Sequence, residues 1–381
     1  MMVLFLNRPD SLAQPGGDTI QMLKTKQCLE RLGVEVTVSY QLRPALSGFD
    51  LAHVFNLQRP DETLAQVSSV VRGKTPVVIS PIVWDLWRLK FEAAARWRAV
   101  RRLLPKALVA PFCWAEQNAL FRVRRGHRIA QGVLHMVDAI LPNSRGEIEF
   151  LARRFGSGLR EKCYVIPNAV DPSVFDQAKA GLETVPEGLP ESGFVLQVGR
   201  IEPVKNQLGT LRALQHDDVP LVFVGAEPPG ARAYAEHCRG LAKQRRDVFF
   251  LGPVPHQVLA AIYARAKVHV LPSFRETPGL ASLEAGLMGC NVVTTDQGPT
   301  YEYFGPWAWY CNPASIRSIR QAIISALSAP RNKELQQRIR RYFTWDQAAR
   351  RTLAVYERVL SSKQAQYASS LLLDAKPQPL A

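Results

Sequence analysis

Residues 194–205 read FVLQVGRIEPVK, and this stretch decides the fold. Its first five residues are apolar except for Gln197 and have the length of a buried strand. A glycine follows at once, and helical spacing resumes further on. Four more short apolar runs follow in the same rhythm, at residues 221–224, 248–251, 268–271 and 291–294. Short strands that alternate with helices predict a parallel sheet covered by helices.

The first half of the chain repeats this rhythm. Strands are predicted at residues 3–6, 34–38, 51–55, 76–80, 139–143 and 164–167, and a helix over residues 19–32. Between the halves, GLETVPEGLPESG is rich in turn residues and marks a linker. We therefore expect an α/β protein with two domains. Their predicted bounds are 1–180 and 194–344, with a linker at 181–193, a last helix at 345–361 and a flexible tail at 362–381.

The composition excludes a disordered chain. The 381 residues are 47% hydrophobic and 21% charged, which suits a globular protein with real cores. The net charge of +15 favours anionic partners, namely nucleic acid, an acidic membrane surface or phosphorylated small molecules. A basic surface that serves solubility is the plain alternative. No nucleic-acid-binding module is recognisable, so nucleic acid is not expected as a partner.

The six cysteines contain no C-x-x-C pair, so the sequence gives no zinc or redox motif. Scattered cysteines in a chain of this length suit reduced, buried thiols. The apolar run at residues 1–6 is too short for a signal peptide. No run of about 20 uncharged apolar residues is available to span a bilayer. We expect a cytoplasmic protein.

Ligands of open parallel sheets bind at the carboxyl ends of the strands. The predicted strand at 194–198 is followed by Gly199, Arg200 and Lys205. The guanidinium offers a planar fork and the ammonium a point charge, and a diphosphate needs both kinds of contact. A pair of solvated surface cations is the alternative interpretation.

A second group follows the predicted strand at 268–271. Glu276 stands in a loop, Pro278 and Gly279 turn the chain into a helix that Leu280 begins, and Glu284 follows within that helix. Free amides at the start of this helix would attract an anion, and the helix dipole adds to the attraction. The two carboxylates could bind sugar and ribose hydroxyls. A chance spacing of two glutamates is the alternative.

Taken together and in this order, these features resemble glycosyltransferase family four, a group of retaining GT-B enzymes. The resemblance is strongest over residues 143–298. Its motifs are IPNAVD at 166–171 followed by Phe175, Gly199-Arg200 with Lys205, Pro272-Ser273, and the stretch from Glu276 to Glu284 followed by Ala285, Gly286 and Gly289. Gly16-Gly17 resembles the family's amino-terminal glycine loop, and the last helix its closing helix. The implied fold is two Rossmann-like domains facing each other across a cleft, with that helix packing back on the first.

The resemblance implies a role for each matched residue. Arg200 and Lys205 would neutralise the leaving diphosphate, and Glu276 would hold the donor sugar; these three are the catalytic candidates. The donor-binding candidates are Gly16, Gly17, Gly199, Arg200, Lys205, Val254, Glu276, Pro278, Gly279, Leu280 and Glu284. No metal and no cofactor are implied, because protein cations replace a metal. Retention would proceed by front-face attack, with the leaving diphosphate as the base.

The implied function is transfer of a hexose-type sugar from a nucleotide-diphosphate donor to a glycan or lipid-linked acceptor, in cell-surface polysaccharide or glycolipid synthesis. A catalytically inactive scaffold that binds nucleotide sugars and an epimerase of the same fold are the rival hypotheses. One departure from the family favours the scaffold: no histidine follows the strand at 76–80. His53 and Asp85 are the candidate substitutes on the acceptor side, although a lone histidine is more often a packed residue.

Other departures are Ala169 in place of the family's usual glycine, and Thr277-Pro278-Gly279 after the first glutamate, where many relatives have Phe-Gly. Residues 84–128 interleave basic and aromatic side chains in the acceptor region of the family. This pattern suits peripheral contact with an anionic membrane, and thus a lipid-linked acceptor at its inner face. A solvated basic face over an aromatic core is the alternative.

Overall fold

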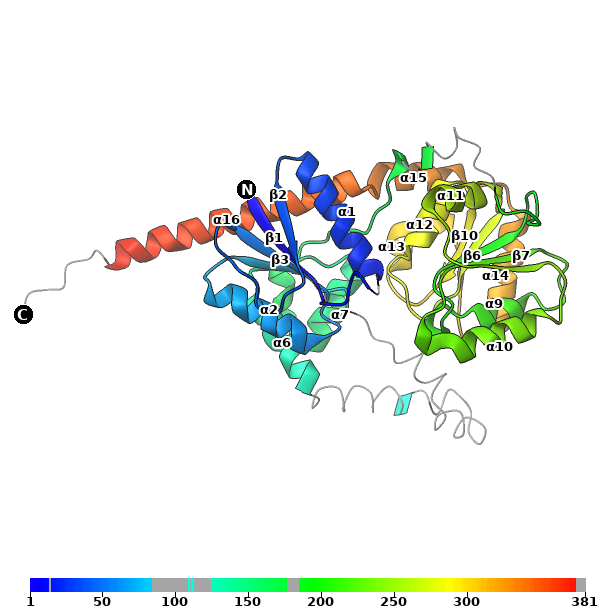
Figure 1. Ribbon diagram of the computed structural model, residues 1–381, viewed down its shortest axis with the longest axis horizontal. Helices are drawn as coiled ribbons and strands as arrows, with labels where there is room; N and C mark the ends of the chain where they lie inside the picture. Colours follow the sequence, from blue (N-terminus) through cyan, green and yellow to red (C-terminus); the bar gives the residue numbers. More distant parts are fainter. Residues whose placement is uncertain are drawn as a thin grey trace, which may run out of the picture. The chain divides into compact units, whose positions relative to one another are not determined.

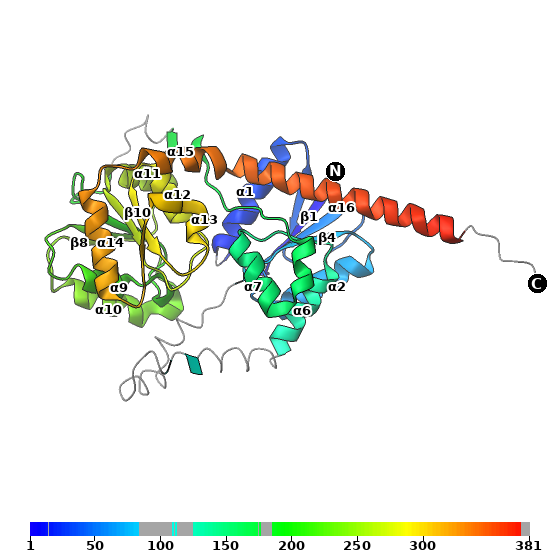
Figure 2. The ribbon, with the colours of Figure 1, turned by 180° about the vertical axis from the view of Figure 1, so that it is seen from behind.

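The computed structural model describes residues 1–13, 15–83, 109, 111–112, 125–173, 175–176 and 185–374, with side chains through residue 365. The chain forms two compact units (Figures 1 and 2). Unit 1 contains the described residues of 1–83, 125–167 and 345–374, and unit 2 contains residues 109 and 111–112 and the described residues of 168–344. The chain thus enters unit 2 after Pro167 and returns to unit 1 at Trp345.

Unit 1 is built on a five-stranded parallel sheet in the order β2-β1-β3-β4-β5. Its strands are β1 (Met2–Leu6), β2 (Glu35–Ser39), β3 (Leu51–Phe55), β4 (Val77–Ser80) and β5 (Ala139–Ile140). The central strands β3 and β4 are buried along their whole length, which explains why their sequences are mostly apolar. The chain leaves β1 in both directions across the sheet, so its topological switch point lies between β1 and β3.

Helices cover both faces of this sheet (Figures 1 and 2). Their bounds are α1 (Gly17–Arg31), α2 (Pro60–Arg72), α6 (Arg125–Met136), α7 (Arg145–Phe155) and α16 (Trp345–Asp374). Side chains of α2, α6 and α7 pack in one core with alternate residues of β1, β3 and β4. On the opposite face α16 packs along α1, and Lys363 pairs with Asp138 at 2.7 Å. Helix α7 begins at a true N-cap, because the Ser144 hydroxyl accepts from the Glu147 amide at 3.0 Å.

Unit 2 is built on a six-stranded sheet in the order β11-β10-β9-β6-β7-β8, with every described pairing parallel. The strands are β6 (Val195–Val198), β7 (Leu221–Val224), β8 (Val248–Leu251), β9 (Val268–Leu271), β10 (Asn291–Thr295) and β11 (Trp309–Cys311). From β6 the chain runs outward through β7 and β8, then returns to the other side of β6 with β9. The switch point of unit 2 therefore lies between β6 and β9, where ligands of such sheets bind.

Two cores flank this sheet, because side chains alternate between its faces. Val195, Leu221 and Phe223 face one core, which α9, α10 and α14 cover. Leu196 and Val222 face the other, which α11, α12, α13 and α15 cover. The helix bounds are α9 (Gln207–Ala213), α10 (Arg232–Ala242), α11 (His256–Arg265), α12 (Leu280–Leu287), α13 (Thr300–Phe304), α14 (Ile316–Ser328) and α15 (Lys333–Tyr342). Short 3-10 helices complete the unit, among them η2 (Pro203–Lys205).

The predicted α/β class with two parallel sheets is confirmed, and four details differ from the expectation. Residues 164–167 form no strand: Cys163 makes a single bridge to Ile140, and extended chain follows. Strand β11 was not predicted. Residues 168–176 pack with unit 2 rather than with the first domain, since Val170 and Phe175 lie in its core. Helix α16 continues through Asp374, so most of the expected tail at 362–381 is helical.

Other predictions fall partly outside the described residues. Of the linker, residues 185–193 have neither helix nor strand, and Val185 and Leu189 pack against the core of unit 2. Asp85 and most of the basic aromatic segment 84–128 lie outside the described residues. The described cysteines carry free thiols. Within the part of the chain that the structure describes, no helix combines the length and apolarity needed to cross a bilayer.

Candidate donor site in unit 2

Lys205 and Glu276 come together at the switch point of unit 2. Lys205 ends the short helix η2 after β6, and Glu276 lies in the loop after β9. Although 71 positions separate them, the Lys205 Nζ lies 2.5 Å from the Glu276 Oε1. The lysine side chain keeps 23% of its surface exposed and the glutamate only 8%. The structure thus pairs two of the three residues predicted to be catalytic.

Side-chain hydrogen bonds to backbone carbonyls hold the loop that carries Lys205. Gln197 donates to the Lys205 carbonyl at 2.8 Å. Asn206 adopts a left-handed conformation with φ of 60°, and its side-chain amide donates to the carbonyls of Pro272 (3.1 Å) and Pro313 (2.9 Å). Asn206 therefore ties together the loops that follow β6, β9 and β11. Sequence analysis missed this residue, because its partners lie 66 and 107 positions away.

Glycines set the close packing around Glu276. At Gly298 φ is +119°, and a Cβ there would sit 2.2 Å from the Glu276 carbonyl oxygen, so no other residue fits. Gly279 has φ of +86°, and a Cβ would meet a Leu271 methyl at 2.8 Å. Gly279 is also the N-cap residue of α12. Gly298 was not among the predicted site residues, although a glycine soon after a strand is a usable signal.

The remaining predicted donor contacts of unit 2 lie at the same edge of the sheet. Gly199 follows β6 with φ of +149°, and Val254 follows β8, where it packs half-buried against the core. Pro278 is buried and Leu280 opens α12. The first amides of a helix have no partner within it, and they carry the positive end of the helix dipole. This edge can therefore attract an anion.

A hydrogen bond from a buried tyrosine orients the Glu284 carboxylate. The Tyr263 hydroxyl donates to the Glu284 Oε2 at 3.1 Å, and the His256 Nε2 lies 3.7 Å from the Oε1. Tyr263 is fully buried, which raises its pKa well above 10, and the negative charge of Glu284 raises it further. The hydroxyl therefore stays protonated and serves as a donor. Tyr263 was not predicted, because an aromatic residue in an apolar helix face is typical of a core.

A neutral histidine lies near Lys205 of the ion pair. His269 on β9 is fully buried, and its Nδ1 lies 3.5 Å from the Ser282 hydroxyl. Burial, and to a lesser extent the charge of Lys205, lowers the pKa of His269 to about 3. The ring is therefore uncharged at neutral pH, so it adds no positive charge of its own beside Lys205.

Arg200, the third catalytic candidate, has a different environment. Its guanidinium pairs with Glu202 at 2.9 Å, and its side chain is 53% exposed. The Glu202 side chain is only 16% exposed, so the exposed partner of the pair is the arginine. Its guanidinium is therefore accessible to an incoming phosphate.

The predicted residues of unit 1 have separate environments. Gly16 is the N-cap residue of α1, where a Cβ would sit 2.6 Å from an Asp18 carboxylate oxygen, and Gly17 opens the helix. His53 is buried in the sheet. Its Nδ1 lies 2.6 Å from the Tyr356 hydroxyl and its Nε2 2.9 Å from the Ser80 hydroxyl.

Burial lowers the pKa of His53 to about 3, so the ring is neutral, and it packs against Phe5 and Phe55. With both nitrogens engaged and 1% of its surface exposed, His53 fits the packed alternative rather than an acceptor contact.

Comparison with known proteins bears on the same half of the chain. Residues 185–344 match the family model of group 1 glycosyl transferases. The second half of the chain is therefore similar to these glycosyl transferases. This match contains the whole sheet of unit 2 and every candidate donor residue of that unit.

Two curated relatives extend this likeness beyond the residues that the family model covers. It is 28% identical over 247 residues to glycogen synthase of Mycobacterium tuberculosis, covering 61% of this chain and 57% of that protein. It is 29% identical over 224 residues to D-inositol 3-phosphate glycosyltransferase of Jonesia denitrificans, covering 52% of each. The matches thus span little more than half the length of these relatives.

Solved structures show the same fold over nearly the whole chain. Sucrose-phosphate synthase from Thermosynechococcus elongatus superimposes with a TM-score of 0.72 at 17% identity, covering 95% of this chain and all of that one. The HepE protein of Anabaena, in complex with UDP and glucose, gives 0.67 at 16% identity, covering 93% and 99%. The GT-B fold expected from the sequence is therefore confirmed.

Proposed function

We propose that this protein is a glycosyltransferase that moves a sugar from a nucleotide-diphosphate donor bound at the candidate donor site. The observation that carries the proposal is the Lys205–Glu276 pair, which lies at the switch point of unit 2 near the start of α12. A cation, a carboxylate and helix amides at one sheet edge match the chemistry of a diphosphate joined to a sugar.

Lys205 and Arg200 stabilise the negative charge that grows on the diphosphate as it leaves, together with the first amides of α12. Such preorganised charge is usually the largest contribution to catalysis. The acceptor oxygen bonds to the anomeric carbon, the bond from that carbon to the diphosphate breaks, and the acceptor proton passes to the departing diphosphate. No metal or cofactor takes part in this scheme, and the anomeric configuration is retained.

The two glutamates orient the donor. Glu276 accepts hydrogen bonds from the sugar hydroxyls once Lys205 turns toward the phosphates, and Glu284, held by Tyr263, accepts from the ribose hydroxyls. The hydrogen bond from Tyr263 fixes the orientation of the Glu284 carboxylate. The structural neighbour from Anabaena was solved with UDP and glucose, so uridine diphosphate and a hexose are the first donor to test.

The proposal extends to the setting of the reaction. The acceptor is a glycan or lipid-linked glycan of a cell-surface polysaccharide or glycolipid, a pathway supported by the likeness to an O-antigen chain mannosyltransferase of Escherichia coli, 27% identical over 179 residues, 43% of this chain and 46% of that one. We place the enzyme in the cytoplasm, with residues 84–128 on the inner face of an anionic membrane.

A thermal-shift panel of UDP, GDP, ADP and TDP tests the donor site, because a ligand that binds only the folded protein raises its midpoint. Arg200→Ala is compared with Arg320→Ala, a matched control. Arg320 is 54% exposed and pairs with Asp217 before β7, at the opposite edge of the sheet. We expect one nucleotide to stabilise the wild type and the control, and Arg200→Ala to lose most of the shift. Equal shifts in both variants would contradict the proposed phosphate contact.

A transfer assay with the nucleotide that binds completes the test. Release of nucleoside diphosphate from its hexose derivatives is followed with Glu276→Gln as the comparison. We expect turnover in the wild type and its loss in the variant, with the nucleotide still bound. Binding without turnover in both proteins would favour the inactive scaffold.

A further inference from the structure

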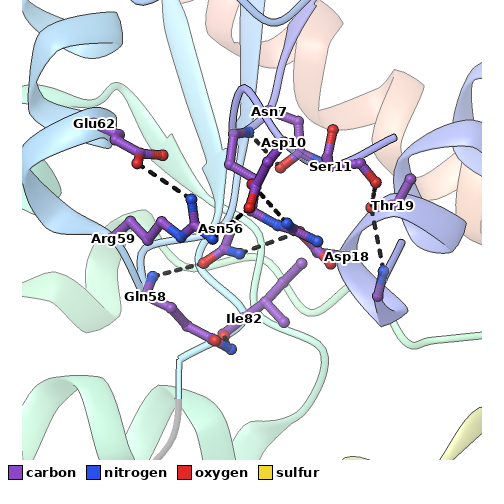
Figure 3. A network of polar contacts seen from close by, with 12 residues as sticks. Asn7, Asp10, Ser11, Asp18, Thr19, Asn56, Gln58, Arg59, Glu62 and Ile82 are labelled. Atoms are coloured by element: carbon purple, nitrogen blue, oxygen red, sulfur yellow. Dashed lines mark hydrogen bonds and ion pairs between the residues drawn. The ribbon is translucent and has the colours of Figure 1, made fainter. Parts of the chain in front are cut away.

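Two clusters of charged side chains in unit 1 differ in their balance of charge. At the carboxyl ends of β1 and β3, the cations already have carboxylate partners: Arg8 and Arg59 pair with Asp10, Asp18 and Glu62 (Figure 3). That cluster has no surplus positive charge. A second cluster lies at the opposite edge of the sheet, beside the first residue of β5, and there cations outnumber carboxylates.

The second cluster surrounds a small cavity between α16 and the amino-terminal end of β5. This α16 cavity has a volume of about 140 Å³, and its walls are formed by Asp138, Tyr164, Arg358, Val359, Ser362 and Lys363. Sites for drug-sized ligands have volumes of about 300 Å³ or more, so this cavity suits one small group rather than a whole nucleotide. None of its residues belongs to the candidate donor site.

Arg358 presents its guanidinium to the cavity in a defined plane. The guanidinium carbon lies 5.4 Å from the centroid of the Tyr164 ring, and this cation–π contact holds the group in place. Among the residues that the structure describes, Arg358 has no carboxylate partner. Its fork of N–H donors is therefore available, and that fork matches two oxygens of a phosphate.

Lys363 provides a second charge, and Asp138 holds it in position. The Lys363 Nζ lies 2.7 Å from the Asp138 Oδ1, and the Val77 amide donates to the Asp138 Oδ2 at 2.9 Å. Both carboxylate oxygens are thus engaged, so Asp138 orients the lysine. The Lys363 side chain is still 46% exposed and can reach a ligand that enters from solvent.

Lys162 brings a third cation to the same carboxylate. Its Nζ donates to the carbonyls of His135 (3.2 Å) and Val137 (3.0 Å), at the end of α6. It lies close enough to Asp138 for the two charges to attract each other. Asp138 is therefore shared between two lysines, and it cannot neutralise both.

The charge balance selects the kind of ligand. Three cations against one carboxylate leave a surplus of about two positive charges, since Glu161 and Glu357 do not line the cavity. A phosphomonoester carries about 1.5 to 2 negative charges at pH 7, which matches this surplus. A phosphodiester or a carboxylate carries only one.

We propose that the α16 cavity binds the phosphate group of a phosphomonoester. Arg358 takes two of its oxygens, and Lys363 neutralises the third. The inference concerns unit 1 alone and does not depend on the proposed function. A phosphorylated small molecule and the headgroup of a lipid such as phosphatidic acid share this chemistry.

Two binding experiments on the full chain distinguish these sources. Every protein carries Arg200→Ala, which weakens phosphate binding at the candidate donor site. Calorimetric titration with inorganic phosphate measures the free ligand. Sedimentation with phosphatidylcholine vesicles that contain phosphatidic acid, or an equal share of the diester phosphatidylglycerol, measures the lipid. We expect saturable binding of inorganic phosphate. A preference for phosphatidic acid over phosphatidylglycerol would identify a lipid, and no preference a soluble phosphate.

Variants locate the site. Arg358→Gln removes the guanidinium and Lys363→Met the ammonium, and the loss of charged hydrogen bonds should weaken the binding of inorganic phosphate about tenfold in each case. Arg125→Gln is the matched control. It removes the same charge from a side chain at the start of α6 that is 83% exposed and pairs with Asp61. We expect this control to bind phosphate as the parent protein does.

Two results would overturn the inference. One is phosphate binding that Arg358→Gln weakens no more than Arg125→Gln does, because general attraction to a basic surface would then explain it. The other is the absence of binding in both experiments. With Arg200 intact, the nucleotide shift should be the same in Arg358→Gln and the wild type, so the donor proposal is judged by a separate measurement.

Discussion

Replacing Lys205 with methionine tests the ion pair at the candidate donor site. The substitution keeps the length of the side chain but leaves the Glu276 carboxylate, only 8% exposed, without its cation. Exposed pairs contribute about 1 kcal/mol or less, and breaking a fully buried one costs about 3–5 kcal/mol. Since Lys205 is 23% exposed, we expect a loss of about 2 kcal/mol in the free energy of unfolding. For a unit of this size, that lowers the midpoint by about 4–8 °C.

The double variant Lys205→Met with Glu276→Gln shows whether the loss comes from an unpaired charge. Replacing both partners with uncharged groups of similar shape removes the desolvated charge, so most of the lost stability should return. Urea unfolding followed by circular dichroism, with Arg320→Ala as the control for a broken exposed pair, gives the free energies. Sugar transfer should be lost in all three variants of the pair.

Two results would refute this reasoning. A Lys205→Met protein as stable as the wild type would mean that the pair contributes nothing to the fold. A double variant less stable than either single one would mean that the residues stabilise unit 2 by packing rather than by charge.

Three further predictions concern buried groups. His53 and His269 have pKa values lowered to about 3 by burial, against about 6.5 in the unfolded chain, so stability is complete above pH 6.5 and falls as pH drops toward 3. Each unit should lose about 2 kcal/mol between pH 6.5 and pH 5, measured by urea unfolding. Gly298→Ala should cost about 3 kcal/mol or more in thermal unfolding, because the methyl would collide with the Glu276 carbonyl and φ is positive. Tyr263→Phe removes a hydrogen bond to a carboxylate, worth about 1.5 kcal/mol, so the nucleotide should bind about tenfold more weakly by calorimetric titration.

Each of these predictions has a control. His53→Gln should flatten the pH dependence of unit 1 alone, and a pH-independent wild type would contradict the assignment of neutral histidines. Gly240→Ala, on helix α10 with open space around it, should be neutral or stabilising. If Gly298→Ala behaves in the same way, the close contact at Glu276 is absent. Unchanged nucleotide affinity in Tyr263→Phe would remove Glu284 from the donor contacts.

The helices and strands could be predicted from the sequence where the burial of an element determines a local pattern of apolar residues. Runs such as 195–198 and 77–80 are buried along their whole length and mostly apolar, because both faces of a parallel sheet are covered. The same pattern failed at 164–167, where only one bridge forms, because a short apolar run also suits extended chain beside a sheet. Strand β11, Trp309–Cys311, escaped prediction because three residues give too little periodicity.

The candidate site was predictable in part for the same reason. Carboxyl ends of parallel strands meet at one edge, so residues after strands, such as Lys205 and Glu276, could be expected near one another. Their partners could not. The hydrogen bond from Tyr263 to Glu284 and the close approach of Gly298 to Glu276 join different elements, and no local pattern encodes them.

The sequence by itself determined the two α/β halves and the loops that carry charge after their strands, because periodicity and turn residues act over a few neighbouring positions. Only the tertiary structure decided which charges meet. The order of parallel strands depends on packing between distant segments, and that order places Lys205 against Glu276 and leaves Arg200 with Glu202. The same packing encloses His53 as a neutral ring within the sheet, and brings Arg8, Asp10 and Arg59 together at the edge of unit 1.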